Sequence, residues 1–408
     1  MAEYPALRPL DFQPVYHRGQ QMWFLRDPMQ LSPYQIFMPP ALAQMLLFCD
    51  GTRTPRQIHA AFCQHVGEQV DFDLIADTLQ QLDTACLLNN ETSRLALAKV
   101  EQEFRAQSHR PPALADLSYP ADAAELTRLF DSYAAEDYLN GWQGWQGRAM
   151  VAPHIDYQRG GKVYAKVWRR AQTAVLDADL VIILGTDHNG GFGTFTLTRL
   201  PYATPYGVIP TDVDLVDKLA KAISPEEAYK EEIHHRNEHS VELSAVWLHY
   251  ICHKAGQEPP PMVPILIGSF HQFVVNGEHP SLDELLMTAV DTLKRETAGK
   301  KVLIVASVDL SHVGPAFSDD FVMDEGRREH LHEEDGRLME AVLTGDHASF
   351  YDQIASIEDR NHVCGFSPIY LMLRYLESVE NGLKVDYLHC PADAQDDSLV
   401  SICGLLLE

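Results

Sequence analysis

The clearest pattern in the chain is a series of short apolar runs that alternate with segments of helical periodicity. The stretches AMVAPHIDY, DLVIILGTDH, MVPILIG and KVLIVASVDLSH each begin as a buried strand, and LKVDYLHC and SLVSICGLLL add two late strands. Helical segments such as GGKVYAKVWRRAQTA, SVELSAVWLHYIC and SLDELLMTAVDTLKRE lie between them. Continuous apolar strands that alternate with helices predict an α/β fold, with a layered sheet covered on both faces.

Residues 1–94 show helical rather than strand periodicity. Apolar residues fall on one face of PPALAQMLLFCDG, of the segment after Thr54-Pro55 and of VDFDLIADTLQQLDTACLL, which predicts three short helices. Thr54 is a capping residue and Pro55 suits the first position of a helix. The order of these elements, with DGTRTPRQI and LDTACLL, resembles a small winged-helix-like domain of the PqqD type.

The 408 residues of the chain exceed one typical core, so we expect more than one domain. Residues 95–146 contain HRPPALADLSYP between two helical segments and are expected to form a helical linker. Residues 147–408 hold the alternating strands and helices, and are expected to form the main α/β domain.

The charge of the chain argues against a nucleic-acid partner. The formal net charge is −26, and residues 1–94 carry six Arg and no Lys against ten Asp and Glu. Phosphate backbones require clustered Lys and Arg. A peptide or protein is therefore the partner expected at the N-terminal domain, and a docking domain with no ligand of its own is the alternative.

Two further features favour a cytoplasmic protein without a membrane segment. The first residues, MAEYPALRPL, lack the apolar run of a signal peptide, and the longest apolar runs are about half a membrane span. The seven Cys are scattered without a CxxC pair, which argues against a disulfide framework or an iron–sulfur cluster.

Histidines follow three of the predicted strands. His154, His188 and His312 come a few residues after the apolar runs in PHIDY, LGTDHNGG and SVDLSHVG. Ligands bind at the carboxyl ends of strands in open α/β sheets, so these side chains are expected to converge. A single such His is more often structural, and Asp309 can simply cap a turn. Convergence of several with a soft or acidic ligand predicts a metal site.

Cys364 lies in the stretch RNHVCGFSPIY and has three open roles: nucleophile, metal ligand or core residue. No positioned base or oxyanion cradle can be assigned for a nucleophile. Ser367-Pro368 begins a helix through LMLRYL, which places Cys364 at a helix entry. A helix N-terminus favours the thiolate, the form that binds a metal.

Six motifs in order, PHIDY, LGTDHNGG, HSVELSAVWL, VPILIGSF, ASVDLSHVG and CGFSPI, resemble the Memo family, the B component of the AmmeMemoRadiSam system. The resemblance covers about residues 147–408. It implies a fold shared with class III extradiol dioxygenases and a metal held by His154, His188 and Cys364. Two neighbourhoods depart from the family: Ile155-Asp156 follows the first His, and Thr186-Asp187 precedes the second.

The resemblance also implies chemistry and partners. One divalent metal is expected, preferably Fe(II) or copper, with zinc also suited to such ligands. His239, His312 and Asp309 are the candidate catalytic groups, with the two His as an acid/base pair. A radical-SAM enzyme and an AMMECR-like protein are the expected partners. Asp187 is expected to fix the tautomer of a ligand.

Two other functions stay open on the sequence. The first is a metal-holding scaffold without turnover. The second is a zinc hydrolase, suggested by His239 with Glu242 and by His330, His332 and Glu333. Neither set has the HExxH register that places two His on one helix face beside a catalytic Glu.

Overall fold

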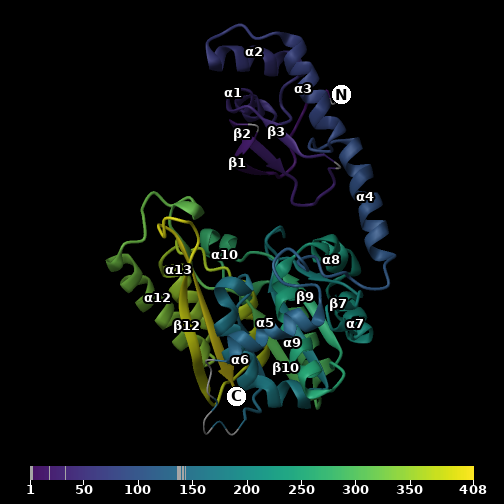
Figure 1. Cartoon of the computed structure of the whole chain (residues 1–408). Helices are drawn as coiled ribbons and strands as arrows, with labels where there is room; N and C mark the ends of the chain where they lie inside the picture. The colour runs from purple at the N-terminus through teal and green to yellow at the C-terminus, as the bar shows by residue number, and fades with distance from the viewer. Residues whose placement is uncertain (1–2, 18, 33, 136–138, 140–141, 143) are drawn as a thin grey trace. The chain divides into compact units, whose positions relative to one another are not determined.

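The computed structural model describes the chain except residues 1–2, 18, 33, 136–138, 140–141 and 143. The chain forms two compact units, Met1–Ala106 and Gln107–Glu408, each of which is described by itself (Figure 1). Within the expected linker, the helix that ends at Arg105 belongs to the first unit and the chain from Gln107 belongs to the second. Part of that linker, among residues 136–143, lies outside the described residues.

The first unit combines a small sheet with helices. Its antiparallel sheet has the order β1-β2-β3, with β1 Asp11–His17, β2 Gln20–Arg26 and β3 Ile36–Met38. Its helices are α1 Pro40–Ala43, η1 Gln44–Phe48, α2 Pro55–Val66, α3 Phe72–Thr84 and α4 Glu91–Arg105. The helices confirm the periodicity of the sequence. The sheet was not predicted, and the winged-helix and PqqD likeness stays a prediction.

The predicted capping of α2 is confirmed in detail. Thr54 accepts the N–H of Gln57, and the Gln57 side chain accepts the N–H of Thr54, which forms a capping box. Ile58 on this helix packs with Ile75 and Leu79 of α3, and all three are fully buried. The N-terminal unit therefore has a core of its own.

The second unit is built on one eight-stranded mixed sheet. Its strand order is β11-β13-β4-β10-β5-β9-β6, with β12 paired to β13. The strands are β4 Ala149–Ala152, β5 Leu180–Thr186, β6 Phe195–Leu197, β9 Met262–Ile267, β10 Val302–Ser307, β11 His312–Val313, β12 Gly382–Pro391 and β13 Leu399–Leu407. Strands β4, β10, β5 and β9 run parallel, and the strands at both edges run antiparallel. The predicted α/β sheet is confirmed as a mixed sheet with a parallel centre.

Helices cover both faces of this sheet. One face packs against α5 Ala123–Ala134, α6 Tyr157–Asp177 and α9 His239–Ala255. The other packs against α7 Val213–Ile223, α11 Glu284–Thr297, α12 Glu325–Leu343, α13 His347–Ser356 and α14 Phe366–Leu376. Alternate residues of β5 enter the two cores: Ile182 faces one and Ile183 the other. Burial on both faces explains why these strands read as continuous apolar runs.

Shorter elements connect the layers. They are the hairpin β7 Tyr202–Thr204 and β8 Gly207–Ile209, and the helices α8 Pro225–Tyr229, η2 Glu232–Arg236, α10 His271–Asn276, η3 Pro280–Leu282 and η4 Pro315–Phe317. This hairpin lies in the stretch PYATPYGVIP, where β7 and β8 pair antiparallel. No helix within the described part of the chain has both the length and the apolar character needed to span a bilayer.

Candidate metal centre

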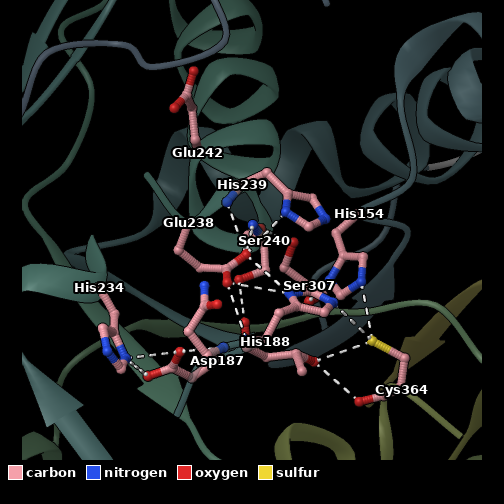
Figure 2. Close-up of polar contacts among 12 residues, drawn as sticks. His154, Asp187, His188, His234, Glu238, His239, Ser240, Glu242, Ser307 and Cys364 are labelled. Atoms are coloured by element: carbon pink, nitrogen blue, oxygen red, sulfur yellow. Dashed lines mark hydrogen bonds and ion pairs between the residues drawn. The ribbon is translucent and has the colours of Figure 1, made fainter. Parts of the chain in front are cut away.

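The polar residues after the parallel strands meet at the carboxyl edge of the sheet. His154 follows β4, His188 follows β5, and Cys364 lies directly before α14, whose N-cap is Gly365 (Figure 2). The parallel register of β4, β10 and β5 brings these strand ends side by side. The topology therefore places at one point three residues that are up to 210 positions apart in sequence.

Cys364 stands between the two histidines. Its Sγ lies 3.1 Å from Nε2 of His154 and 3.5 Å from Nε2 of His188. Zinc bonds of about 2.05 Å to N and 2.3 Å to S, at a tetrahedral angle, place such atoms about 3.6 Å apart. The donor atoms are thus close to the spacing that a bound metal requires.

The outer nitrogens of both imidazoles are held by hydrogen bonds. His154 donates from Nδ1 to the carbonyl oxygen of Ser307 at 2.9 Å. His188 donates from Nδ1 to the Glu238 carboxylate, with both oxygens at 3.1 Å. Donation from Nδ1 leaves Nε2 with a free lone pair in each neutral ring. Both lone pairs are on the nitrogens that face Cys364.

The expected role of Asp187 as the partner of a ligand is wrong. Its carboxylate accepts from Nδ1 of His234 at 2.8 Å, whereas Glu238 holds His188. Neighbouring residues at the end of a strand point to opposite sides, so Asp187 and His188 cannot serve one cluster together. Glu238 is the N-cap of α9 and also accepts the backbone N–H groups of His239 and Ser240.

His239 joins this group as a third imidazole. Its ring stacks on His188 with centroids 4.7 Å apart, and its Nδ1 lies 3.0 Å from Glu238. Ring nitrogens of His154, His188 and His239 all lie within 4.8 Å of one another. The residue predicted for acid/base chemistry is thus also placed as a potential ligand.

The charges around the site shape the protonation of its histidines. Burial lowers the pKa of His154 well below its usual value, with His188 and His239 acting in the same direction. Burial alone would lower the pKa of His188, but Glu238 and Cys364 outweigh burial and hold it well above normal. Burial likewise opposes ionisation of Glu238, yet His188 and His239 hold its pKa well below normal. A carboxylate and a sulfur thus surround His188 with negative potential, which favours a cation.

Asp309 and His312 lie next to the group formed by His154, His188 and Cys364. Asp309 accepts the backbone N–H groups of His154 and Ile155, and burial raises its pKa to about 6. His312 is held at Nδ1 by the carbonyl of Leu310 at 3.2 Å, and burial lowers its pKa to about 4. Asp309 therefore positions the loop that carries His154, and His312 presents a neutral ring.

The turn before α14 fixes the position of Cys364. Its N–H donates to the carbonyl of Leu310 at 2.9 Å, and the N–H of Gly365 donates to the carbonyl of Asp309 at 2.8 Å. A Cβ on residue 365 would lie 2.7 Å from that Asp309 oxygen, so only glycine fits there. Thr186 completes the anchor by donating its hydroxyl to the carbonyl of Cys364 at 3.0 Å.

The candidate hydrolase residues are not arranged for hydrolysis. Glu242 is buried and bound to Arg110 and to Tyr119, so its carboxylate is not available as a base. His330 pairs with Glu334 on α12, and His332 packs edge-on against Tyr387. His330, His332 and Glu333 lie on the exposed side of α12.

Three contributors to the site were missed by sequence reasoning: Glu238, Ser307 and Thr186. Glu238 had only a weak signal, because it directly precedes the predicted helix but Glu is not among the preferred N-cap residues. Ser307 acts through its main-chain carbonyl, which has no sequence signature. Thr186 acts through a contact across 178 residues, which only the fold reveals.

Comparison with known proteins places most of the chain in one family. The profile described as Memo-like protein matches residues 110–406. A MEMO1 family protein of Aquifex aeolicus (strain VF5) is 25% identical over 404 residues, 98% of this chain and 99% of the relative. A MEMO1 family protein of Thermococcus kodakarensis is 29% identical over 69% of this chain and 91% of the relative. One of Archaeoglobus fulgidus is 26% identical over 73% of this chain and 98% of the relative.

Proposed function

The chain belongs to the Memo-like protein family, and we propose that it holds one divalent transition metal between His154, His188 and Cys364. The observation that carries this proposal is the meeting of a sulfur and two lone-pair nitrogens at one point, with Sγ–Nε2 distances of 3.1 and 3.5 Å. Donation from both Nδ1 atoms directs the two Nε2 atoms to the metal, and binding at His188, whose pKa Glu238 and Cys364 hold well above normal, displaces the proton on Nε2.

The donor set favours a soft or borderline metal. Two imidazoles and a thiolate suit Fe(II), copper or zinc, and the thiolate shifts the preference toward copper and zinc relative to a carboxylate. Bound there, a redox-active metal would supply electron transfer or activation of dioxygen or of a phenol-like substrate. We propose an oxidoreductase of dioxygenase-like fold as the function, by the resemblance of its motifs.

The surrounding residues have separable tasks in this proposal. Glu238 orients His188 and His239 through their Nδ1 atoms. His239 and His312 are the proposed acid/base pair, because each is held at Nδ1 and keeps Nε2 for a substrate proton. Asp309 holds the loop at His154 through main-chain hydrogen bonds, and its Oδ2 lies 3.7 Å from Nε2 of His154, so we keep it as a proposed catalytic group.

The partners follow the resemblance to the AmmeMemoRadiSam system. We propose a radical-SAM enzyme and an AMMECR-like protein as partners of the chain. We further propose that the unit Met1–Ala106 binds a peptide or a partner protein, since its acidic balance disfavours nucleic acid. The Aquifex aeolicus relative is covered over 99% of its length, so it offers a second chain in which to test this.

Element-resolved metal analysis of protein purified without air tests the metal site. We expect the double variant His188→Ala/Cys364→Ala to carry about one equivalent of metal less than the parent chain. The matched control is His59→Ala/Cys63→Ala, because these two side chains also touch, with Nε2 and Sγ 3.5 Å apart, in the N-terminal unit. Full metal retention in the first double variant contradicts the assignment.

Oxygen consumption separates an enzyme from a scaffold. The iron-loaded chain is mixed with a panel of catechols under limiting oxygen, with His239→Ala as the variant that keeps Cys364 and His154. We expect consumption by the parent chain and a loss in the variant. A metal-loaded chain that never consumes oxygen with any catechol favours the scaffold.

A further inference from the structure

A second cluster of ligand-type side chains lies on the other side of the end of β5. His188 turns toward Cys364, whereas Asp187 turns toward His234 (Figure 2). Glu231 lies on the same side, with its carboxylate 4.0 Å from Nδ1 of His234. Consecutive residues of an extended chain point to opposite sides, so a single strand end can supply two separate sites. Of this second group, sequence reasoning gave a role only to Asp187, as the partner of a ligand of the first site, and that role belongs to Glu238.

The geometry of this second group suits a cation. One ligand atom from each of Asp187, Glu231 and His234 lies within 4.8 Å of the other two. Nδ1 of His234 is 2.8 Å from Asp187 and 4.0 Å from Glu231. The side chains are 0%, 20% and 9% exposed for Asp187, Glu231 and His234, so this is not a solvated acidic surface.

The charge of the group is not balanced by protein cations. Among the described residues, the ion pairs of Asp187 and Glu231 are formed with His234 alone. The buried Asp187 carboxylate and the Glu231 carboxylate, which is 20% exposed, thus share one imidazole, which compensates at most one of them. Buried charges are costly unless each is paired. A divalent cation balances both carboxylates and leaves His234 neutral as a ligand.

The glycines of the loop after β5 hold the group together. A Cβ on Gly190 would lie 2.6 Å from Cγ of Asp187, so the backbone there passes directly over that carboxylate. The N–H of Gly191 donates to both carboxylate oxygens of Glu231, at 3.2 and 3.1 Å. The loop Asn189-Gly190-Gly191 thus packs on both acidic side chains.

We propose that Asp187, Glu231 and His234 bind a second divalent cation, distinct from the metal at Cys364. The donor set is two carboxylates and one imidazole, which suits zinc, manganese or Fe(II), with water at the open positions. The two sites differ in softness, since only the first contains sulfur. This proposal does not depend on the proposed function, because it requires neither Cys364 nor turnover.

Cobalt(II) is the probe, because thiolate ligation gives an intense near-ultraviolet band that oxygen and nitrogen ligands do not give. The full chain, stripped of metal, is titrated with Co²⁺ without air. We expect two equivalents to bind, one of them with the thiolate band.

Glu231→Gln is expected to bind one equivalent and keep the band. Glu227→Gln, which removes an exposed acid of α8 nearby in sequence, is the matched control and keeps both.

Cys364→Ser is expected to give the reverse result: the band is lost and one equivalent still binds. His234→Gln repeats the test of the second site with a neutral side chain that preserves volume, and far-ultraviolet circular dichroism checks that each variant is folded. Binding of a single equivalent that shows the thiolate band by the parent chain overturns the proposal, as does a folded Glu231→Gln or His234→Gln variant that still binds two. A parent chain that binds one equivalent without the band refutes the first site instead, provided Glu231→Gln abolishes that equivalent.

Discussion

Two buried polar clusters lie one helical turn apart at the start of α9. In one cluster several ligand atoms converge on one point, whereas in the other the polar atoms are hydrogen-bonded to one another and to the backbone. We call the first the histidine–cysteine cluster; its members are His154, His188, Glu238, His239 and Cys364. We call the second the Arg110 cluster; its members are Arg110, Tyr119 and Glu242. In the Arg110 cluster, the Glu242 oxygens accept from Arg110, from Tyr119 and from two backbone N–H groups. In the histidine–cysteine cluster, two Nε2 atoms and a sulfur face one another.

The difference separates a group that holds the fold from one that can bind a ligand. The Arg110 guanidinium also donates to the main-chain carbonyls of His235 and Glu238. It therefore holds the segment that leads into α9. A buried network with every partner in place rigidifies a core. Ligand atoms that converge without such saturation are available to a metal. The two clusters therefore differ in how completely their polar atoms are hydrogen-bonded, rather than in burial or charge.

The largest expected effect is on stability, from breaking the Arg110 cluster. Arg110→Ala leaves the Glu242 carboxylate buried without its cation, which we expect to cost about 3–5 kcal/mol of the free energy of unfolding. Urea unfolding followed by tryptophan fluorescence measures it, because four of the five Trp lie after Gln107. The double variant Arg110→Met/Glu242→Leu removes both charges and is expected to lose less than the single variant.

Arg199→Ala is the control for that prediction. Arg199 pairs with Asp217 at 2.5 Å, but both side chains are about half exposed, at 55% and 47%. Exposed ion pairs contribute about 0–1 kcal/mol. If Arg110→Ala costs no more than Arg199→Ala, the Arg110 cluster is not a structural anchor and the comparison fails.

The second effect is on metal affinity. Glu238→Gln keeps the shape of the side chain but removes the carboxylate that holds His188 and His239. Loss of such an outer partner weakens metal affinity about 10–100-fold. Competition with a chelator of known affinity measures the change. An unchanged affinity would show that Glu238 serves only as the N-cap of α9.

The smallest effect is a pH dependence from a satisfied histidine further along α9. His249 is buried and bonded through Nδ1 to the Thr204 hydroxyl at 2.7 Å; burial, with His253 beside it, lowers its pKa to about 4. The unfolded chain takes up this proton near pH 6.5 and the folded chain does not, so stability is lost as pH falls from 6.5 toward 4. The slope approaches about 1.4 kcal/mol per pH unit.

The difference in unfolding free energy between the parent chain and His249→Gln isolates this contribution, since other titrating groups cancel. We expect the advantage of the parent chain to shrink between pH 7.5 and 5. If the difference in unfolding free energy between the parent chain and the variant does not change with pH, the His249 imidazole is more hydrated than the structure shows.

The sequence predicted the parts of the site that depend on strand ends. His154 and His188 were found because parallel strands deliver their following residues to one edge, which periodicity alone reveals. Cys364 was found from its place before a helix together with the resemblance. The strands of the central sheet were also found, because burial on both faces leaves an unbroken apolar run.

The missed features depend on contacts between distant segments or on weak patterns. Arg110 lay in an expected linker, yet it is fully buried against α9 across more than 120 residues. Asp187 was given the role of Glu238, because sequence adjacency to His188 does not show which way a side chain points. Strands β1 and β2 are mostly exposed or half-buried, and β1 contains Pro14, which is unfavourable within a strand, so neither gave a clear alternation.

The central claim is that Cys364 and two histidines bind one metal, and X-ray absorption of the zinc-loaded chain tests it most directly. To isolate this site, the measurement uses the Glu231→Gln background with one equivalent of zinc. The account predicts one sulfur at about 2.3 Å and nitrogen ligands at about 2.0–2.1 Å, with the sulfur lost in Cys364→Ser. A spectrum with nitrogen and oxygen alone, unchanged by Cys364→Ser, would contradict it.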